Sequence, residues 1–147
     1  EMSASLVGSE MCIRDRLLPV KDTPFDFNKR KRIGQDLEAD HIQLKNAFGY
    51  DHSFVLNGTE NQLTLEEPVS GRRLIISTTA PVVQVYTGNF LKDGCIGKAG
   101  RVYENREGVA LETQLMPNAI NTEKNPSTIL RKGDKFESNT KYVFEIM

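Results

Sequence analysis

The sequence predicts an all-β protein, built as an antiparallel sandwich or a barrel. Short runs rich in β-branched and aromatic residues recur at close spacing, with turn residues between them. No segment repeats its apolar residues at the spacing of a long amphipathic helix. The predicted strands are Gln62–Glu66, Arg72–Thr79, Val82–Tyr86, Gly108–Pro117 and Lys141–Met147.

Turn residues separate these runs. Asn57-Gly58 is a turn pair, and Glu67–Gly71 contains a proline, a serine and a glycine in five residues. Pro81 interrupts the apolar stretch between two of the predicted strands, because proline cannot donate to a central ladder. The pattern of the second half of the chain therefore predicts a meander of short antiparallel strands.

The first third of the chain is less regular. Leu17–Val20 is compatible with the end of a strand, and the cationic run Asn28–Arg32 is expected to be a solvated turn rather than an anion-binding patch. Between Asp36 and Phe48 the apolar spacing is irregular, so a short helical turn near Leu37–His41 and a plain loop both remain open.

Composition limits the classes of function. The chain has 147 residues, about one domain, with 38% hydrophobic and 27% charged residues. Its formal net charge of −1 gives no reason to expect nucleic acid or an anionic membrane as a partner. No apolar run approaches the ~20 residues of a membrane helix. With two cysteines and two histidines, neither a disulfide framework nor a cysteine-rich metal site is expected.

Residues 1–16 differ from the rest of the chain. They show neither strand alternation nor a complete helical stripe, and they lack the apolar core of a secretory signal. The run from Leu6 to Arg16 resembles the translation of a transposon-end adapter used in preparing sequencing libraries. We therefore expect residues 1–16 to be a non-native tail, which would also remove Cys12 from consideration.

One carboxylate and one amide stand inside predicted strands. Glu112 lies between Leu111 and Thr113 in a run that otherwise looks buried, and burying a charge is costly unless it is paired or used. The alternative is that Glu112 points to the solvent face of an alternating strand. Gln84 lies in the densest β-forming segment, where an amide needs hydrogen-bond partners from the protein or from a ligand.

Other candidate sites are weaker. Asp51-His52 pairs a carboxylate with an imidazole, but neighbours on a strand point to opposite faces, so we expect His52 to be a partly buried histidine bonded to backbone. His41 lies in a polar segment and is given no role. The glycines of the loop Leu91–Gly100 lack a phosphate-loop motif, and Cys95 within it is expected to be a passive thiol.

Six ordered motifs resemble one family. Gly49–Leu56, Pro81–Leu91 and Gly108–Asn121 look like the C-terminal part of an aldose 1-epimerase, or galactose mutarotase. Three further motifs support the resemblance, and they are Thr23–Phe27, Ser70–Arg72 and Pro126–Gly133. It implies that residues 17–147 are the C-terminal portion of one large antiparallel β-sandwich domain with an open sugar-binding cleft.

The resemblance also implies a chemistry that needs no metal or organic cofactor. In the family a glutamate takes the proton of the C1 hydroxyl while a histidine protonates the ring oxygen, so that the ring opens and recloses as the other anomer. Glu112 matches the glutamate base. Asp51 matches an aspartate that binds sugar hydroxyls, and Gln84 a glutamine of the same cleft. Asn118 stands where an aspartate is commoner, a departure without an expected effect on chemistry.

Three functional residues of the family lie upstream of the part that this chain resembles. They are the acid histidine, a second substrate-binding histidine and a sugar-contacting arginine. Neither His41 nor His52 matches these histidines. We therefore expect this chain to be inactive by itself. A non-catalytic carbohydrate-binding sandwich is the alternative; an enzyme acting on a phosphorylated hexose finds little support. The expected partner is a hexose, glucose or galactose. Oligomeric state is open, as is the compartment, with cytoplasm favoured over periplasm.

Overall fold

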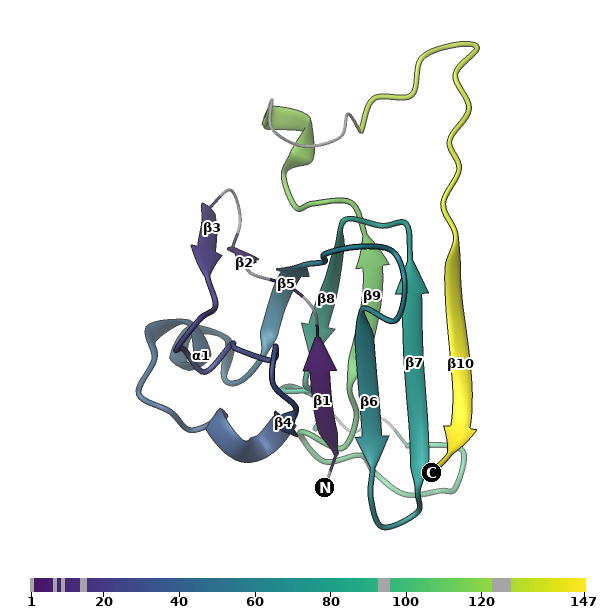
Figure 1. Ribbon diagram of the computed structural model, residues 1–147. Helices are drawn as coiled ribbons and strands as arrows, with labels where there is room; N and C mark the ends of the chain where they lie inside the picture. Colours follow the sequence, from purple (N-terminus) through teal and green to yellow (C-terminus); the bar gives the residue numbers. More distant parts are fainter. Residues whose placement is uncertain (1, 7, 9, 14–15, 93–95, 123–127) are drawn as a thin grey trace.

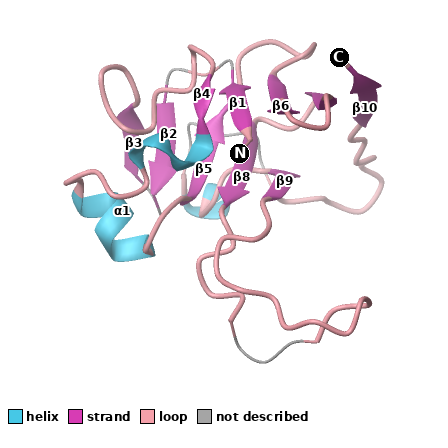
Figure 2. Ribbon diagram, turned by 90° about the horizontal axis from the view of Figure 1, so that it is seen from below, coloured by secondary structure: helices cyan, strands magenta, loops and turns pink. Residues whose placement is uncertain are grey.

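The computed structural model describes residues 2–6, 8, 10–13, 16–92, 96–122 and 128–147. Within these ranges the strands form two five-stranded antiparallel sheets, which confirms the predicted all-β class. Figure 1 shows the two sheets as separate layers, and Figure 2 shows them from below. Cys95 and the first part of the Pro126–Gly133 motif lie outside the described residues.

The first sheet has the order β10-β7-β6-β1-β4. Its strands are β1 (Ser3–Leu6), β4 (Lys31–Arg32), β6 (Leu63–Glu67), β7 (Arg72–Thr78) and β10 (Thr140–Ile146). The second sheet has the order β3-β2-β5-β8-β9. Its strands are β2 (Glu10–Ile13), β3 (Arg16–Pro19), β5 (Asp51–Val55), β8 (Val82–Tyr86) and β9 (Ala110–Gln114).

The predicted strands of the second half of the chain are all present, with ends that differ by up to three residues. Residues 1–16 show no strand alternation in the sequence, yet this segment contains β1 and β2. Four residue pairs join β1 to β6, and β2 pairs with β5 through Met11 and Cys12. These strands depend on partners far away in the sequence, which a local alternation pattern cannot reveal.

Helical structure is confined to short pieces. A 3₁₀ turn at Ile33–Asp36, helix α1 at Ile42–Ala47 and a 3₁₀ turn at Ala119–Asn121 are present in the described residues. The short helix thus begins after His41 rather than at Leu37. The reason is capping: His41 Nδ1 accepts a hydrogen bond from the Gln43 amide, and Phe48 ends the helix in a left-handed conformation. No helix among the described residues has the length and apolar character to cross a membrane.

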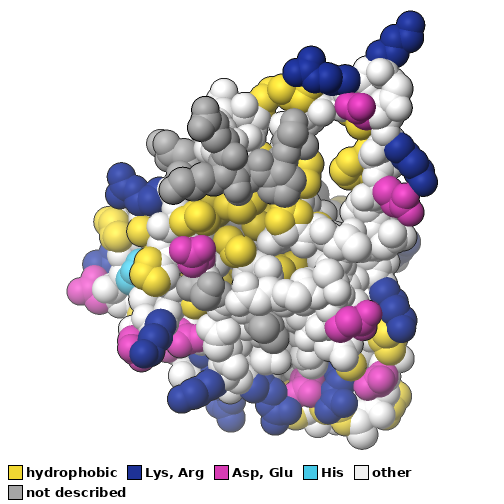
Figure 3. Space-filling model, turned by 45° about the horizontal axis from the view of Figure 1, so that its top comes forward, with side chains coloured by type: hydrophobic (Ala, Val, Ile, Leu, Met, Phe, Trp, Pro, Cys, Tyr) yellow, Lys and Arg dark blue, Asp and Glu magenta, His cyan; other side chains and the backbone are white. Residues whose placement is uncertain are grey.

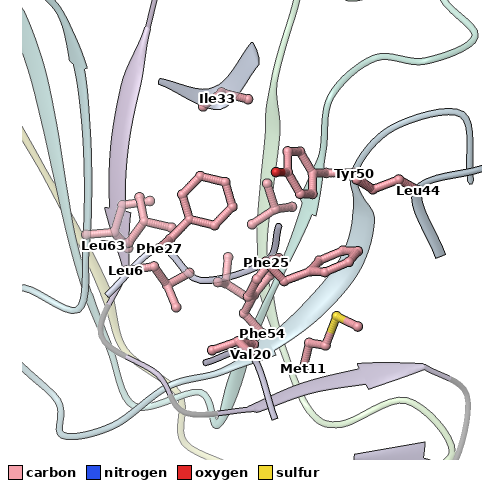
Figure 4. Close-up of a cluster of buried hydrophobic side chains, with 13 residues drawn as sticks. Leu6, Met11, Val20, Phe25, Phe27, Ile33, Leu44, Tyr50, Phe54 and Leu63 are labelled. Atoms are coloured by element: carbon pink, nitrogen blue, oxygen red, sulfur yellow. The ribbon is translucent and has the colours of Figure 1, made fainter. Parts of the chain in front are cut away.

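The space between the sheets holds the main core (Figure 4). Phe25 is fully buried there, with its ring edge-on to Tyr50 at 5.5 Å between centroids. Side chains from both sheets surround this aromatic centre, among them Leu6, Leu63, Ile76, Phe54, Val83 and Val85. Cys12, Val82, Met116 and Ala119 form a smaller, separate cluster. Close packing of the main core makes the second sheet a rigid support for side chains on its outer face.

Candidate functional site

Two of the predicted site residues, Gln84 and Glu112, lie in one row across three neighbouring strands. Ser53 on β5 is directly opposite Gln84 on β8, and Gln84 is directly opposite Glu112 on β9. Residues directly opposite each other in antiparallel strands point to the same face of the sheet. Asp51 lies two residues before Ser53 and therefore shares that face. This face is the one turned away from the main core, since Phe54 and Val83 occupy the alternate positions.

Hydrogen bonds fix the side chain of Gln84 within this row. Its Nε2 donates to Asp51 Oδ1 at 2.7 Å, and its Oε1 accepts from the hydroxyl of Ser53. An ionised carboxylate can only accept, so the amide nitrogen must face Asp51 and the amide oxygen must face Ser53. Gln114 Nε2 lies 3.4 Å from Ser53 Oγ and extends the network to β9. The partners expected for the Gln84 amide are therefore supplied by the protein.

An open cleft of about 890 Å³ lies against this row. Asp51, Ser53 and Gln84 form part of its wall. Other polar atoms come from Gln43 and Asn46 of α1, and the remaining lining residues are Cys12, Arg16, Leu18, Ala47, His52, Phe90 and Pro117. A concave site with several converging carboxylate, amide and hydroxyl groups is suited to a small polyhydroxylated molecule, whose hydroxyls both donate and accept hydrogen bonds.

Glu112 is exposed, so of the two alternatives left by the sequence the structure shows the side chain on the solvent face of the strand. Among the described residues β9 is the edge strand of its sheet and has a strand neighbour, β8, on one side only. Within the described part of the chain its side chain makes no hydrogen bond or ion pair, and it is not among the residues that line the cleft. Its position is nevertheless fixed by the register, one strand away from Gln84.

The side chain of His52 points to the core face of β5, although the residue also borders the cleft, and it confirms the prediction of a buried histidine bonded to backbone. Only 4% of it is exposed, its Nδ1 accepts from the Asp51 amide at 3.0 Å, and its ring lies 4.7 Å from that of Phe25. Burial lowers the pKa of His52 to about 4, and the nearby Asp51 charge opposes this only in part. The imidazole is therefore neutral at pH 7, with its proton on Nε2.

The sequence thus identified Asp51, Gln84 and Glu112, and the structure brings the first two into direct contact. It did not identify Ser53, although Ser53 lies two residues after Asp51 and period-two alternation could have indicated it. Gln43 and Asn46 carried no recognisable signal, because α1 meets the cleft through tertiary packing. In the described residues no group of three or more histidine, cysteine, aspartate or glutamate side chains is placed to hold a metal ion.

The fold and the site together define a β-sandwich protein with a polar cleft on the outer face of one sheet. The family model for aldose 1-epimerase matches residues 5–143, nearly the whole chain. This chain belongs to the aldose 1-epimerase family.

Individual relatives agree with this placement. Galactose mutarotase of Homo sapiens is 37% identical over 131 residues, which cover 87% of this chain and 37% of that protein. Aldose 1-epimerase of Escherichia coli is 35% identical over 136 residues, covering 88% of this chain and 39% of that protein. The chain therefore spans well under half the length of these relatives.

Solved structures give the same result. The GalM/aldose epimerase homologue from C. elegans superposes with a TM-score of 0.85 at 27% identity, over 99% of this chain and 46% of that one. Galactose 1-epimerase from Lactobacillus acidophilus gives a TM-score of 0.72 at 26% identity, over 99% of this chain and 44% of that one. Both likenesses support the galactose mutarotase-like sandwich that the sequence motifs implied.

Proposed function

We propose that this chain supplies the general base and part of the sugar-binding wall of an aldose 1-epimerase, which interconverts the α and β anomers of a hexose. The observation that supports this most directly is the row of Ser53, Gln84 and Glu112 across β5, β8 and β9, beside an open polar cleft. Galactose and glucose are the proposed substrates, in line with the names of the relatives.

In the proposed reaction, Glu112 removes the proton from the C1 hydroxyl while an acid protonates the ring oxygen. The bond between C1 and the ring oxygen breaks, the C1 carbonyl forms, and rotation about C1–C2 turns its other face toward the C5 hydroxyl. Ring closure with reversed proton transfers then gives the other anomer. An exposed carboxylate suits the base role, because nothing in the described residues neutralises it before the sugar binds.

Asp51 and Gln84 are proposed to hold sugar hydroxyls. Their mutual hydrogen bond of 2.7 Å orients both side chains before the sugar arrives, and such preorganisation reduces the entropy lost on binding. The Asp51 carboxylate retains acceptor sites for hydroxyl donors. Ser53 is proposed as a positioning residue, because its hydroxyl donates to the Gln84 amide oxygen.

We infer that neither histidine of this chain is the acid and that another part of the epimerase supplies it. His52 is buried and its Nδ1 is already occupied by the Asp51 amide, while His41 Nδ1 caps α1. The relatives are more than twice as long as the segment they share with this chain. This chain by itself is therefore expected to leave the spontaneous rate of anomer exchange unchanged.

We also retain the proposal that residues 17–147 are the C-terminal portion of the epimerase domain and that residues 1–16 derive from an adapter. The adapter origin is supported by the similarity of the run from Leu6 to Arg16 to a translated adapter. Two observations weigh against the adapter origin: the family match begins at residue 5, and β1 and β2 pair with β6 and β5. Sequencing the source DNA across this junction without transposon-based library preparation decides the matter.

The base assignment is tested by polarimetry of freshly dissolved α-galactose. In the full-length protein, Glu112→Gln should lower the catalysed rate by ~10²–10⁴-fold, the usual effect of losing one acid–base group. Glu60→Gln is the matched control, since Glu60 is also exposed but lies in a turn away from the cleft. An unchanged rate in Glu112→Gln would refute the role of Glu112.

The alternative is a carbohydrate-binding sandwich without catalysis. The observation that favours it is that both histidines of this chain already use their Nδ1 atoms in structural hydrogen bonds. Nuclear magnetic resonance distinguishes epimerase activity from sugar binding without catalysis. A titration with galactose measures binding, and an exchange experiment measures the rate at which the two anomers interconvert. Binding without accelerated exchange in the full-length protein would establish the alternative.

A further inference from the structure

The turn between β5 and β6 contains the pair Asn57-Gly58, which the candidate site does not use. Asn57, Gly58 and Thr59 are all exposed. Figure 1 shows the connection from β5 to β6 in the upper part of the two sheets. The top of the molecule comes forward in Figure 3, where much of the surface between the charged groups is neither hydrophobic nor charged. Water therefore reaches the side-chain amide of Asn57 and the peptide bond that follows it.

The reacting groups of this pair are not held by the fold. Within the described part of the chain, the side-chain amide of Asn57 makes no hydrogen bond and the backbone amide of Gly58 donates none. Gly58 has φ of +75°, and a Cβ built there would meet no atom within 4 Å. Because glycine has no side chain, its nitrogen can approach the Asn57 side chain without a steric obstacle.

The residues on either side of Asn57 are anchored. The Leu56 amide donates to the Pro81 carbonyl at 2.9 Å, and the Gly58 carbonyl accepts from Gln62 Nε2 at 2.7 Å. Gln62 is 1% exposed. Its Nε2 also donates to the Thr78 carbonyl at 3.0 Å, and its Oε1 accepts from the Thr78 amide at 2.7 Å. The buried Gln62 side chain therefore ties the turn to the end of β7 and leaves Asn57 between two fixed points.

We propose that Asn57-Gly58 is a site of spontaneous deamidation, at which the asparagine is converted into isoaspartate and aspartate. Asparagine is one of the thermolabile residues of proteins. The Gly58 nitrogen attacks Asn57 Cγ, the new bond closes a succinimide ring, and the bond between Cγ and Nδ2 breaks. Nδ2 leaves as ammonia, together with the proton of the Gly58 amide. Water then adds to one of the two ring carbonyls and opens the ring, so the conversion needs no oxidant or reductant.

Isoaspartate lengthens the main chain of this turn. In this product the side-chain methylene of residue 57 becomes part of the backbone, between the two points that the hydrogen bonds of Leu56 and Gly58 hold in place. The added length displaces Gly58, so its carbonyl moves out of reach of Gln62 Nε2. A donor of a buried amide then loses its partner, which lowers the free energy of unfolding. Aspartate, the other product, adds a charge but no length to the main chain.

The test is incubation of the full chain at neutral pH, followed by peptide mapping with mass spectrometry and enzymatic methylation of isoaspartate. Asn57 should react in the folded chain about as fast as in urea, because the fold restrains neither reacting group. Asn105 is the internal control: it is also exposed, but its Oδ1 accepts from the Lys92 amide at 2.8 Å, and the next amide, that of Arg106, donates to the Gly88 carbonyl. Folding should slow Asn105 by on the order of tenfold or more, since reaction there requires local opening.

Two variants separate the length of the main chain from its charge. Asn57→Gln should form no isoaspartate at this position, and its thermal midpoint should not change during incubation. Freshly prepared Asn57→Asp should melt close to the parent, whereas the isoaspartyl form of the parent should melt lower. Folding that slows Asn57 as much as Asn105 would overturn the proposal. A deamidated product without isoaspartate would also overturn it, because the amide would then be lost by direct hydrolysis, and so would an isoaspartyl form that melts with the parent.

Discussion

His52 makes the stability of this chain sensitive to mild acid. In the folded state burial lowers the pKa of His52 to about 4, against 6.5 for an exposed histidine. Between these values the unfolded chain binds a proton that the folded chain does not, so the free energy of unfolding falls as the pH falls. The stabilising contribution is complete above pH 6.5 and is lost progressively down to pH 4. Its full size is about 3 kcal/mol, at about 1.4 kcal/mol per pKa unit.

The assay is urea unfolding followed at pH values from 7.5 to 4.0, with the free energy extrapolated to zero denaturant at each pH. His52→Gln retains a side-chain oxygen that can accept from the Asp51 amide, but it cannot take up a proton. The variant should be less stable than the parent at pH 7.5 and should lose most of the decline between pH 6.5 and 4.

The matched control is Ile76→Val, which removes one methylene from the core on the other sheet and no titratable group. It should lower the free energy of unfolding by ~0.5–1.5 kcal/mol at every pH, giving a parallel curve. If His52→Gln keeps the full decline of the parent, then His52 is not the group that couples protonation to unfolding, and the argument from its burial is refuted.

Two further predictions concern packing and backbone geometry. Phe25→Ala should lower the free energy of unfolding by ~3–5 kcal/mol, because the side chain is fully buried among aromatic neighbours. Phe90→Ala, at a residue that is 56% exposed, should change the free energy of unfolding by about 0.5 kcal/mol or less. Comparable urea midpoints for the two variants would contradict this prediction. Gly49→Ala should lower the thermal midpoint strongly, because φ is +142° and the new Cβ would lie 2.4 Å from Asn89 Oδ1. Gly58→Ala is the control, since φ is also positive at Gly58 but no atom lies within 4 Å of the new Cβ. Equal thermal midpoints for the two alanine variants would show that the close approach to Asn89 is not what requires glycine at position 49.

Local sequence patterns were sufficient for the five strands from β6 to β10, and β9 was predicted from the run Gly108–Pro117. β6, β7, β8 and β10 were predicted because β-branched and aromatic residues with turn residues at both ends favour extended backbone without reference to distant partners. Such patterns were insufficient for β1 and β2. These strands contain few strong strand formers, and they exist because β6 and β5 offer unpaired backbone groups that must be satisfied.

The candidate site shows the same division. Asp51, Gln84 and Glu112 were named from the sequence through motifs that resemble one family, and Gln84 also stood out as an amide within an apolar strand. The register of β5, β8 and β9 brings Gln84 into contact with Asp51 and places it opposite Glu112. These strands are far apart along the chain, so no local signal of that register exists.

The sequence by itself determined the fold class, the family and three of the polar side chains on the second sheet, namely Asp51, Gln84 and Glu112. Alternation along a strand and motif identity are properties of neighbouring residues, so they can be read from the chain directly. Only the tertiary structure decided that Glu112 is exposed, that His52 is buried and neutral, and that Phe144 and Ile146 of β10 are exposed. Each of these depends on which layer lies over a given strand, and the free energy of burial is set by that layer and not by the strand alone.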